Sequence, residues 1–154
     1  MIFGAEIITV LLAIAPIGEL RAAIPVGVSM GLVLWYAVVI SVIANILIGL
    51  LLLLLLDPIA KFLRKYIPIF DRFFDWLFKR TRRKTASKMQ RLGRFMGIFV
   101  LVGIPLPGTG AWTAAAAAFV FGIKFKVAFP AIVLGIFVAA TITALVTAGV
   151  ISLF

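Results

Sequence analysis

Residues 32–56 read LVLWYAVVISVIANILIGLLLLLLL, an uninterrupted run of 25 residues without a charged side chain. About 20 consecutive apolar residues are enough for a helix to cross the hydrocarbon core of a bilayer. The run therefore predicts a transmembrane helix, and we expect Asp57 and Pro58 to end it, because proline disrupts a helix interior. A second uncharged run, Val127–Phe154, predicts another transmembrane helix over residues 127–153.

The composition of the whole chain agrees with this interpretation. Hydrophobic residues make up 65% of the 154 positions, and the mean hydropathy is +1.29. A soluble domain is roughly half apolar, so lipid is the solvent that suits this chain. We therefore predict an all-α, multi-pass integral membrane protein.

Two residue types that carry much of enzyme chemistry are missing, because the sequence contains no Cys and no His. Their absence excludes disulfides, thiolate nucleophiles, Cys/His metal sites and histidine acid–base catalysis. Asp57, Asp71 and Asp75 are expected at or beyond the membrane surface, so they do not form a paired-aspartate site. We expect no enzymatic activity, no metal and no cofactor. No ATP-binding motif is present, so any energy for transport is expected from an ion gradient or the solute's own gradient.

The net charge of +10 is concentrated between the two apolar halves, since residues 57–94 hold twelve of the fifteen Lys and Arg residues. Long apolar runs on both sides favour a cytoplasmic segment that faces anionic lipid headgroups, and we expect no nucleic-acid binding. Within residues 59–80, apolar side chains recur every three or four positions, which predicts an amphipathic helix in the membrane surface. Pro68 is expected to kink or divide it.

Two further apolar blocks, residues 3–30 and 95–122, are interrupted by proline and glycine. Each uninterrupted piece is too short to span a bilayer, so each block predicts a re-entrant helical hairpin. The order hairpin, span, hairpin, span makes residues 1–56 and 95–154 two repeats of one architecture within a single membrane domain.

Charge asymmetry sets the expected topology. If each hairpin returns to the side from which it entered, Lys124 and Lys126 share the cytoplasmic side with the basic segment, as the positive-inside rule requires. The two hairpins then enter from opposite sides, so the repeat is inverted and both termini lie outside the inner (cytoplasmic) membrane. Residues 1–15 lack a basic start and lead into Pro16, so we expect them to belong to the fold and not to a signal peptide.

Glu19 and Arg21 are charged residues inside the first apolar block, where each costs about 3 kcal/mol on insertion scales. Such residues usually face a cavity and usually take part in the protein's function. Their spacing does not put them on one helix face, and Pro16 and Pro25 both oppose a continuous helix, so we expect them near the hairpin turn. The alternative is a salt bridge that only holds the two hairpins together.

The second block contains the motif PLPGTGAW at residues 105–112. Its prolines prevent the preceding helix from continuing, and Gly108 and Gly110 let the backbone approach a partner closely. Thr109 is expected to cap the next helix, whose free N–H groups would form an anion site in the membrane. Arg21 and the amides of Gly108–Gly110 together would then hold a phosphate or carboxylate. A tight turn with tryptophan packing explains the motif by itself nearly as well.

Taken together, the stretches at residues 15–25 (APIGELRAAIP) and 104–112 (IPLPGTGAW) resemble the small multidrug export protein family over nearly the whole chain. The resemblance implies export of small molecules. The layout is also similar to the DedA superfamily, which has facing re-entrant hairpins and includes members implicated in flipping polyprenyl phosphate carriers such as undecaprenyl phosphate. This chain is shorter than DedA proteins and lacks their acid-rich proline motif, so lipid-phosphate transport is an analogy here.

We therefore predict a secondary, ion-coupled transporter that moves a small or amphiphilic, anionic solute through a mid-membrane site between the hairpin turns. Glu19 is expected to couple protons and Arg21 to balance charge, and a homodimer is expected because four membrane-dipping elements are few for one pathway. Two alternatives stay open, a polyprenyl-phosphate carrier flippase and a non-transporting membrane scaffold. The candidate substrate-binding residues are Glu19, Arg21, Asn45, Pro105, Pro107, Gly108, Thr109, Gly110 and Trp112.

Overall fold

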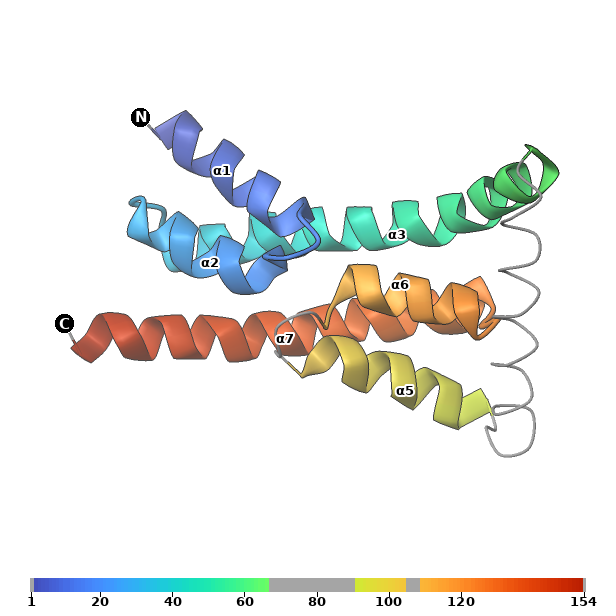
Figure 1. The fold of residues 1–154 in the computed structure, drawn as a ribbon. Coiled ribbons are helices and arrows are strands. Elements are labelled where there is room, and N and C mark those ends of the chain that lie inside the picture. The colour runs from blue at the N-terminus through green and yellow to red at the C-terminus, as the bar shows by residue number, and fades with distance from the viewer. Residues whose placement is uncertain (1, 67–90, 105–108, 154) are drawn as a thin grey trace.

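The computed structural model describes residues 2–66, 91–104 and 109–153, and in these ranges the chain is helical with short connections (Figure 1). The helices are α1 (Ile2–Ile14), α2 (Glu19–Ser29), α3 (Leu34–Tyr66), α5 (Arg91–Gly103), α6 (Ala111–Val120) and α7 (Phe125–Leu153). The prediction of an all-α fold is confirmed for the part of the chain that is described.

The two longest helices contain the apolar runs that the sequence singled out. Leu34–Leu56 of α3 and Phe125–Ser152 of α7 have 23 and 28 residues, which is long enough to cross a bilayer. Only about a third of the most apolar window of each run is buried within the protein, whereas the core helix of a soluble protein is mostly buried. Large apolar side chains such as Leu47 and Leu145 are more than half exposed. These properties indicate a helical membrane protein.

The arrangement in space alternates short and long elements. Figure 1 shows the α1–α2 pair and the α5–α6 pair extending from opposite ends of the molecule, with the end of α1 and the start of α2 facing the end of α5 and the start of α6 near the middle. Helices α3 and α7 run alongside both pairs in opposite directions, and both termini lie at the same end.

The main core forms where α2, α3, α5, α6 and α7 meet. Ile24, Ile132 and Ile136 are its fully buried large side chains, and the alanines of α6 that face α3 and α7 are also buried. Small residues let helix backbones approach closely, which matters in lipid because helices gain little from hiding apolar surface there. Gly49 of α3 shows this closeness, since a Cβ atom there would lie 3.3 Å from Ile132 and 3.6 Å from Ala111.

Two expectations about proline were wrong. Asp57 and Pro58 do not end the first long helix, because α3 continues to Tyr66, and Pro25 lies inside α2. The φ angle of proline is compatible with a helix, and its missing N–H removes one hydrogen bond, which apolar helices tolerate at the cost of a bend. The break in the first block is the turn at residues 15–18, beside Pro16.

The predicted surface helix over residues 59–80 lies largely outside the described ranges. Residues 59–66 continue α3, and nothing further of that segment is described.

Candidate functional site

Four helix ends meet in the middle of the protein, namely the C-terminal ends of α1 and α5 and the N-terminal ends of α2 and α6 (Figure 1). A helix end leaves backbone N–H or C=O groups without a partner in the helix. Apolar surroundings supply no water to bind these groups, so other protein groups have to do so. Side chains of the opposite hairpin and of α3 supply the missing partners here.

Glu19 caps α6 from the other hairpin. It is the first residue of α2, and its side chain is 6% exposed. One carboxylate oxygen accepts from the backbone N–H of Ala111 and the other from that of Trp112, both at 3.3 Å. These amides open α6, so the carboxylate lies at the positive end of the helix dipole. Glu19 has a φ of 47°, a left-handed conformation that costs a non-glycine residue roughly 1–2 kcal/mol.

Gly110 makes room for this contact. It precedes α6 with a φ of 163°, an extended conformation open to any residue, so the need for glycine does not come from the backbone angle. It comes from space, because a Cβ atom at Gly110 would overlap the carboxylate of Glu19.

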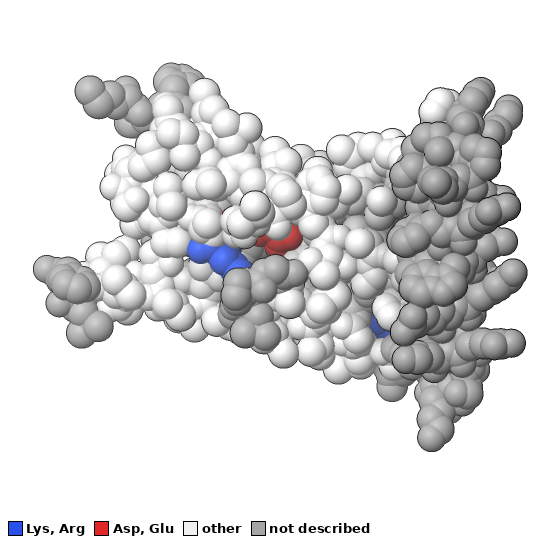
Figure 2. Space-filling model, in the orientation of Figure 1, with Lys and Arg blue, Asp and Glu red and all other residues white. Residues whose placement is uncertain are grey.

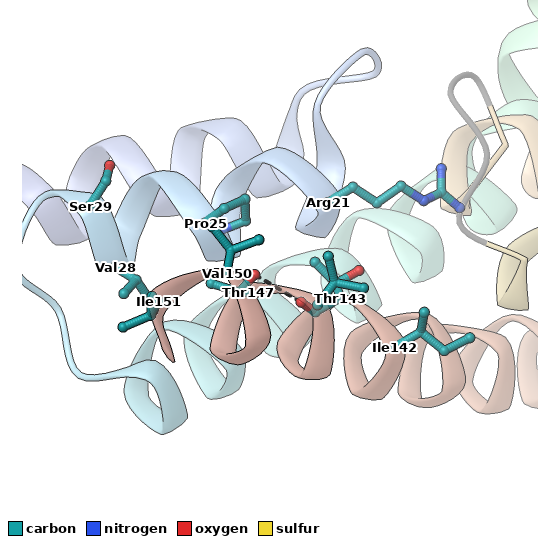
Figure 3. Close-up of a pocket in the computed structure, with 10 residues that line it drawn as sticks. Arg21, Pro25, Val28, Ser29, Ile142, Thr143, Thr147, Val150 and Ile151 are labelled. Atoms are coloured by element: carbon teal, nitrogen blue, oxygen red, sulfur yellow. Dashed lines mark hydrogen bonds between the residues drawn. The ribbon is translucent and has the colours of Figure 1, made fainter. Parts of the chain in front are cut away.

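Arg21 binds the end of α5 in the complementary way. Its Nη2 donates to the carbonyls of Val102 at 3.3 Å and Ile104 at 3.1 Å, and its Nη1 donates to the carbonyl of Thr109. Figure 3 shows the side chain reaching from α2 toward the turn of the second hairpin. A cation at a helix C-terminus meets the negative end of the dipole and satisfies its last carbonyls.

Thr109 does not cap α6, contrary to the sequence-based expectation. Gly110, which has no side chain, holds the N-cap position. The Thr109 hydroxyl instead donates to the carbonyl of Ile104 at 3.0 Å and accepts from Nη2 of Arg21 at 3.2 Å. The capping role falls to Glu19, which lies 92 residues from Ala111 in sequence.

The end of α1 is capped by residues of α6 and α3. The indole N–H of Trp112 donates to the carbonyl of Ile14 at 2.8 Å, and the amide of Asn45 donates to that of Ala13 at 2.7 Å. Asn45 is fully buried, and its side-chain oxygen has no hydrogen-bond partner among the residues that the structure describes. The capping is therefore reciprocal, because residues of the first hairpin cap the second and Trp112 of the second caps the first.

The structure brings six of the nine candidate residues to this junction, and the other three fall on residues that are not described. Those at the junction are Glu19, Arg21, Asn45, Thr109, Gly110 and Trp112. Those outside the described ranges are Pro105, Pro107 and Gly108.

The expected anion site at the start of α6 is filled by the chain's own carboxylate. The α6 amides and Arg21 do not share one anion. The amides bind the Glu19 carboxylate, and Arg21 binds carbonyl groups. Sequence reasoning missed these carbonyl partners, because backbone groups are the same at every residue. Among the described residues, no group of three or more potential metal ligands comes together.

A groove with a volume of about 600 Å³ opens beside the junction, between α2 and α7. Arg21 lines one end, and aliphatic and hydroxyl side chains line the rest (Figure 3). Figure 2 shows positive and negative side chains next to each other in a hollow near the middle of a largely uncharged face. Sequence reasoning did not identify this groove.

Residues 19–142 match the sequence model of the family described as "Putative small multi-drug export protein". The chain belongs to this family. The prediction made from the two motifs is thereby confirmed, and the name of the family refers to export and is not that of a known enzyme family. The residues that match the small multidrug export family include every part of the junction except the end of α1. No curated protein and no solved structure matches the chain.

Proposed function

We propose that this small multidrug export family member is a secondary transporter that carries small or amphiphilic solutes across the membrane, past the junction where the two hairpin turns meet. One observation carries the proposal. Two oppositely charged residues, Glu19 and Arg21, lie among apolar helices and hold together the ends of helices from the two halves of the chain. Intramembrane charges are costly and generally serve function.

The junction is suited to open and close. The two turns contact each other through a few polar contacts at helix ends, whereas α3 packs against α6 and α7, and α2 against α7, through the shared apolar core. We propose that breaking the polar contacts loosens the turns, while the apolar core keeps the two halves packed together. We propose that residues 1–56 and 95–154 are inverted repeats with re-entrant hairpins, an arrangement that supports alternating access.

Glu19 is proposed as the residue that couples protons to this motion. An ionised carboxylate makes charge-assisted hydrogen bonds to the α6 amides, which are about twice as strong as neutral ones. A proton on Glu19 removes that advantage and releases the start of α6. Solute anions compete with Glu19 for the same amides, and Arg21 balances the charge that remains.

The proposed setting is the inner membrane, with residues 57–94 on the cytoplasmic side against anionic headgroups and both termini outside. A homodimer completes the pathway, since the described chain contributes two membrane-length helices and two shorter pairs.

Flux measured with purified protein in proteoliposomes tests the proposal. We expect wild-type protein to release an entrapped anionic dye in response to a proton gradient, and Glu19→Gln to lower that rate at least tenfold. Glu6→Gln is the matched control, because Glu6 accepts a hydrogen bond from the Tyr36 hydroxyl in the first half of α1, whereas it is the end of α1 that reaches the junction. Equal proton-dependent flux in wild type and Glu19→Gln would refute the coupling role. If no dye or lipid probe moves, and Glu19→Gln and Arg21→Ala change only assembly, the protein is a scaffold.

A polyprenyl-phosphate carrier is the second candidate solute, and the position of Arg21 favours it. A guanidinium at the inner end of an apolar groove suits a phosphate better than a drug cation. Labelled polyprenyl phosphate and a cationic dye, compared in one binding assay, separate this candidate from a general drug exporter.

A further inference from the structure

The groove between α2 and α7 differs from the junction in its chemistry. Pro25 and Val28 of α2 face Val150 of α7 across it (Figure 3), and Ile142 and Val146 of α7 also line it. Its volume of about 600 Å³ lies in the range of small-molecule sites. Along α7 the lining runs from Ile142 to Ile151, which corresponds to roughly 14 Å at the helical rise.

The hydroxyl groups in the lining are already satisfied within their own helices. Thr143 and Thr147 donate to the carbonyls of Ala139 and Thr143 at 2.8 Å, and Ser29 donates to Val26 at 2.8 Å. A ligand therefore does not have to satisfy their protons, and the long wall of the groove behaves as an apolar surface suited to a hydrocarbon chain.

The inner end of the groove is cationic. Among the described residues that line the groove, the charged one is Arg21. Its partners in the second hairpin, the carbonyls of Val102, Ile104 and Thr109 and the Thr109 hydroxyl, carry no net charge. Glu19, which carries the nearest negative charge described, faces α6 and does not line the groove. With a positive charge at one end and apolar walls along the rest, the groove would orient a ligand that has an anionic end and an apolar end.

We propose that this groove binds a single-chain amphiphile with an anionic headgroup, the headgroup against Arg21 and the chain along α7. The inference deepens the proposed function and rests on it for the ligand's passage across the membrane. The anionic group is a phosphate or a carboxylate. A cationic amphiphile would bring like charge to Arg21, and a free anion would leave the apolar walls without a partner.

Photolabelling of the full chain in phosphatidylcholine vesicles tests the inference. The probe is dodecyl phosphate with a diazirine at the chain end, and mass spectrometry locates its adducts. We expect adducts on residues 147–151 and 28–29, at the end of the groove away from Arg21. Unlabelled dodecyl phosphate or dodecanoate should remove them, and which of the two competes better identifies the headgroup. Dodecyltrimethylammonium and inorganic phosphate should not compete.

A pair of neighbouring substitutions provides the control. Val146 lines the groove and is 61% exposed, whereas Leu145 is 68% exposed and does not line it. We expect Val146→Phe to lower labelling at least fivefold and Leu145→Phe to leave it unchanged, and both variants should fold because neither side chain is buried. Equal labelling in both variants, or equal competition by the ammonium amphiphile, would overturn the inference.

The two proposals fail in different ways in the same vesicles. Proton-dependent flux without groove labelling removes the groove site and leaves the transporter. Groove labelling that competes as expected, without flux of any probe, supports the binding site and removes transport.

Discussion

Gly110 lies where the carboxylate of Glu19 reaches the first turn of α6, and the space there admits no Cβ atom. We expect Gly110→Ala to lower the stability of the protein by about 1–3 kcal/mol, the usual cost of overfilling a packed site. Thermal unfolding in detergent measures the change. Gly149→Ala is the control, because nothing lies within 4 Å of a Cβ atom at Gly149, and we expect it to be neutral or slightly stabilising.

The same residue pair allows a sharper test of the cause. Glu19→Ala removes the carboxylate that a methyl group at Gly110 would displace, so Gly110→Ala should cost little in that background. A strong coupling between the two substitutions is expected for groups in direct contact. Costs that simply add would show that the methyl group clashes with something else.

The sequence identified Glu19 and Arg21 as unusual for a sound reason, because charge inside an apolar block is costly. It could not identify their partners. Arg21 binds carbonyls 81 to 88 residues away, and Glu19 binds amides 92 and 93 residues away. Backbone groups carry no residue-specific signal, and only the fold brings them to the charges.

At the scale of helices, composition predicted the long elements well and proline predicted the boundaries poorly. The apolar runs at residues 32–56 and 127–153 correspond to the first two thirds of α3 and most of α7. Pro25, Pro58 and Pro130 all lie inside helices, whereas the first block breaks beside Pro16. A proline inside an apolar helix loses one hydrogen bond, but a helix that ends in lipid exposes several unpaired groups. Helices therefore end where partners exist to cap them.

Helix α7 packs closely against α5 at Gly135. A Cβ atom there would lie 2.6 Å from the Cβ atom of Val102 and 3.0 Å from the carbonyl of Phe99. We expect Gly135→Ala to destabilise the protein by roughly 1–3 kcal/mol by forcing the helices apart. At Gly103, on the same crossing, the nearest atom would be at 3.7 Å, so Gly103→Ala should be tolerated. Unfolding temperatures of the two variants decide this, and equal values would show that the crossing is not tightly packed.

At the scale of the whole molecule, the sequence indicated two halves of similar order, and the structure adds how they are joined. The order of hairpin and long helix is visible from where uncharged runs stop. The way the halves are joined is not visible in the sequence, because reciprocal capping depends on the positions of both hairpins in space. Each half supplies hydrogen-bond partners for helix ends of the other half. The backbone groups at the ends of α1, α5 and α6 are therefore not all paired within their own hairpin.

If the junction is the moving part, loss of the Glu19 charge should separate the hairpin turns and leave the rest in place. The chain has no Cys, so pairs of spin labels can be introduced without background. Labels at Ile17 and Ile104, which are 93% and 48% exposed beside the two turns, report the separation. We expect Glu19→Gln to lengthen and broaden this distance distribution in lipid. A second pair at Val100 and Leu134, across the packed α5–α7 surface, should stay unchanged. Turns that remain as close in Glu19→Gln as in wild type would mean that apolar packing alone holds the hairpins together, and the carboxylate would then have no part in gating.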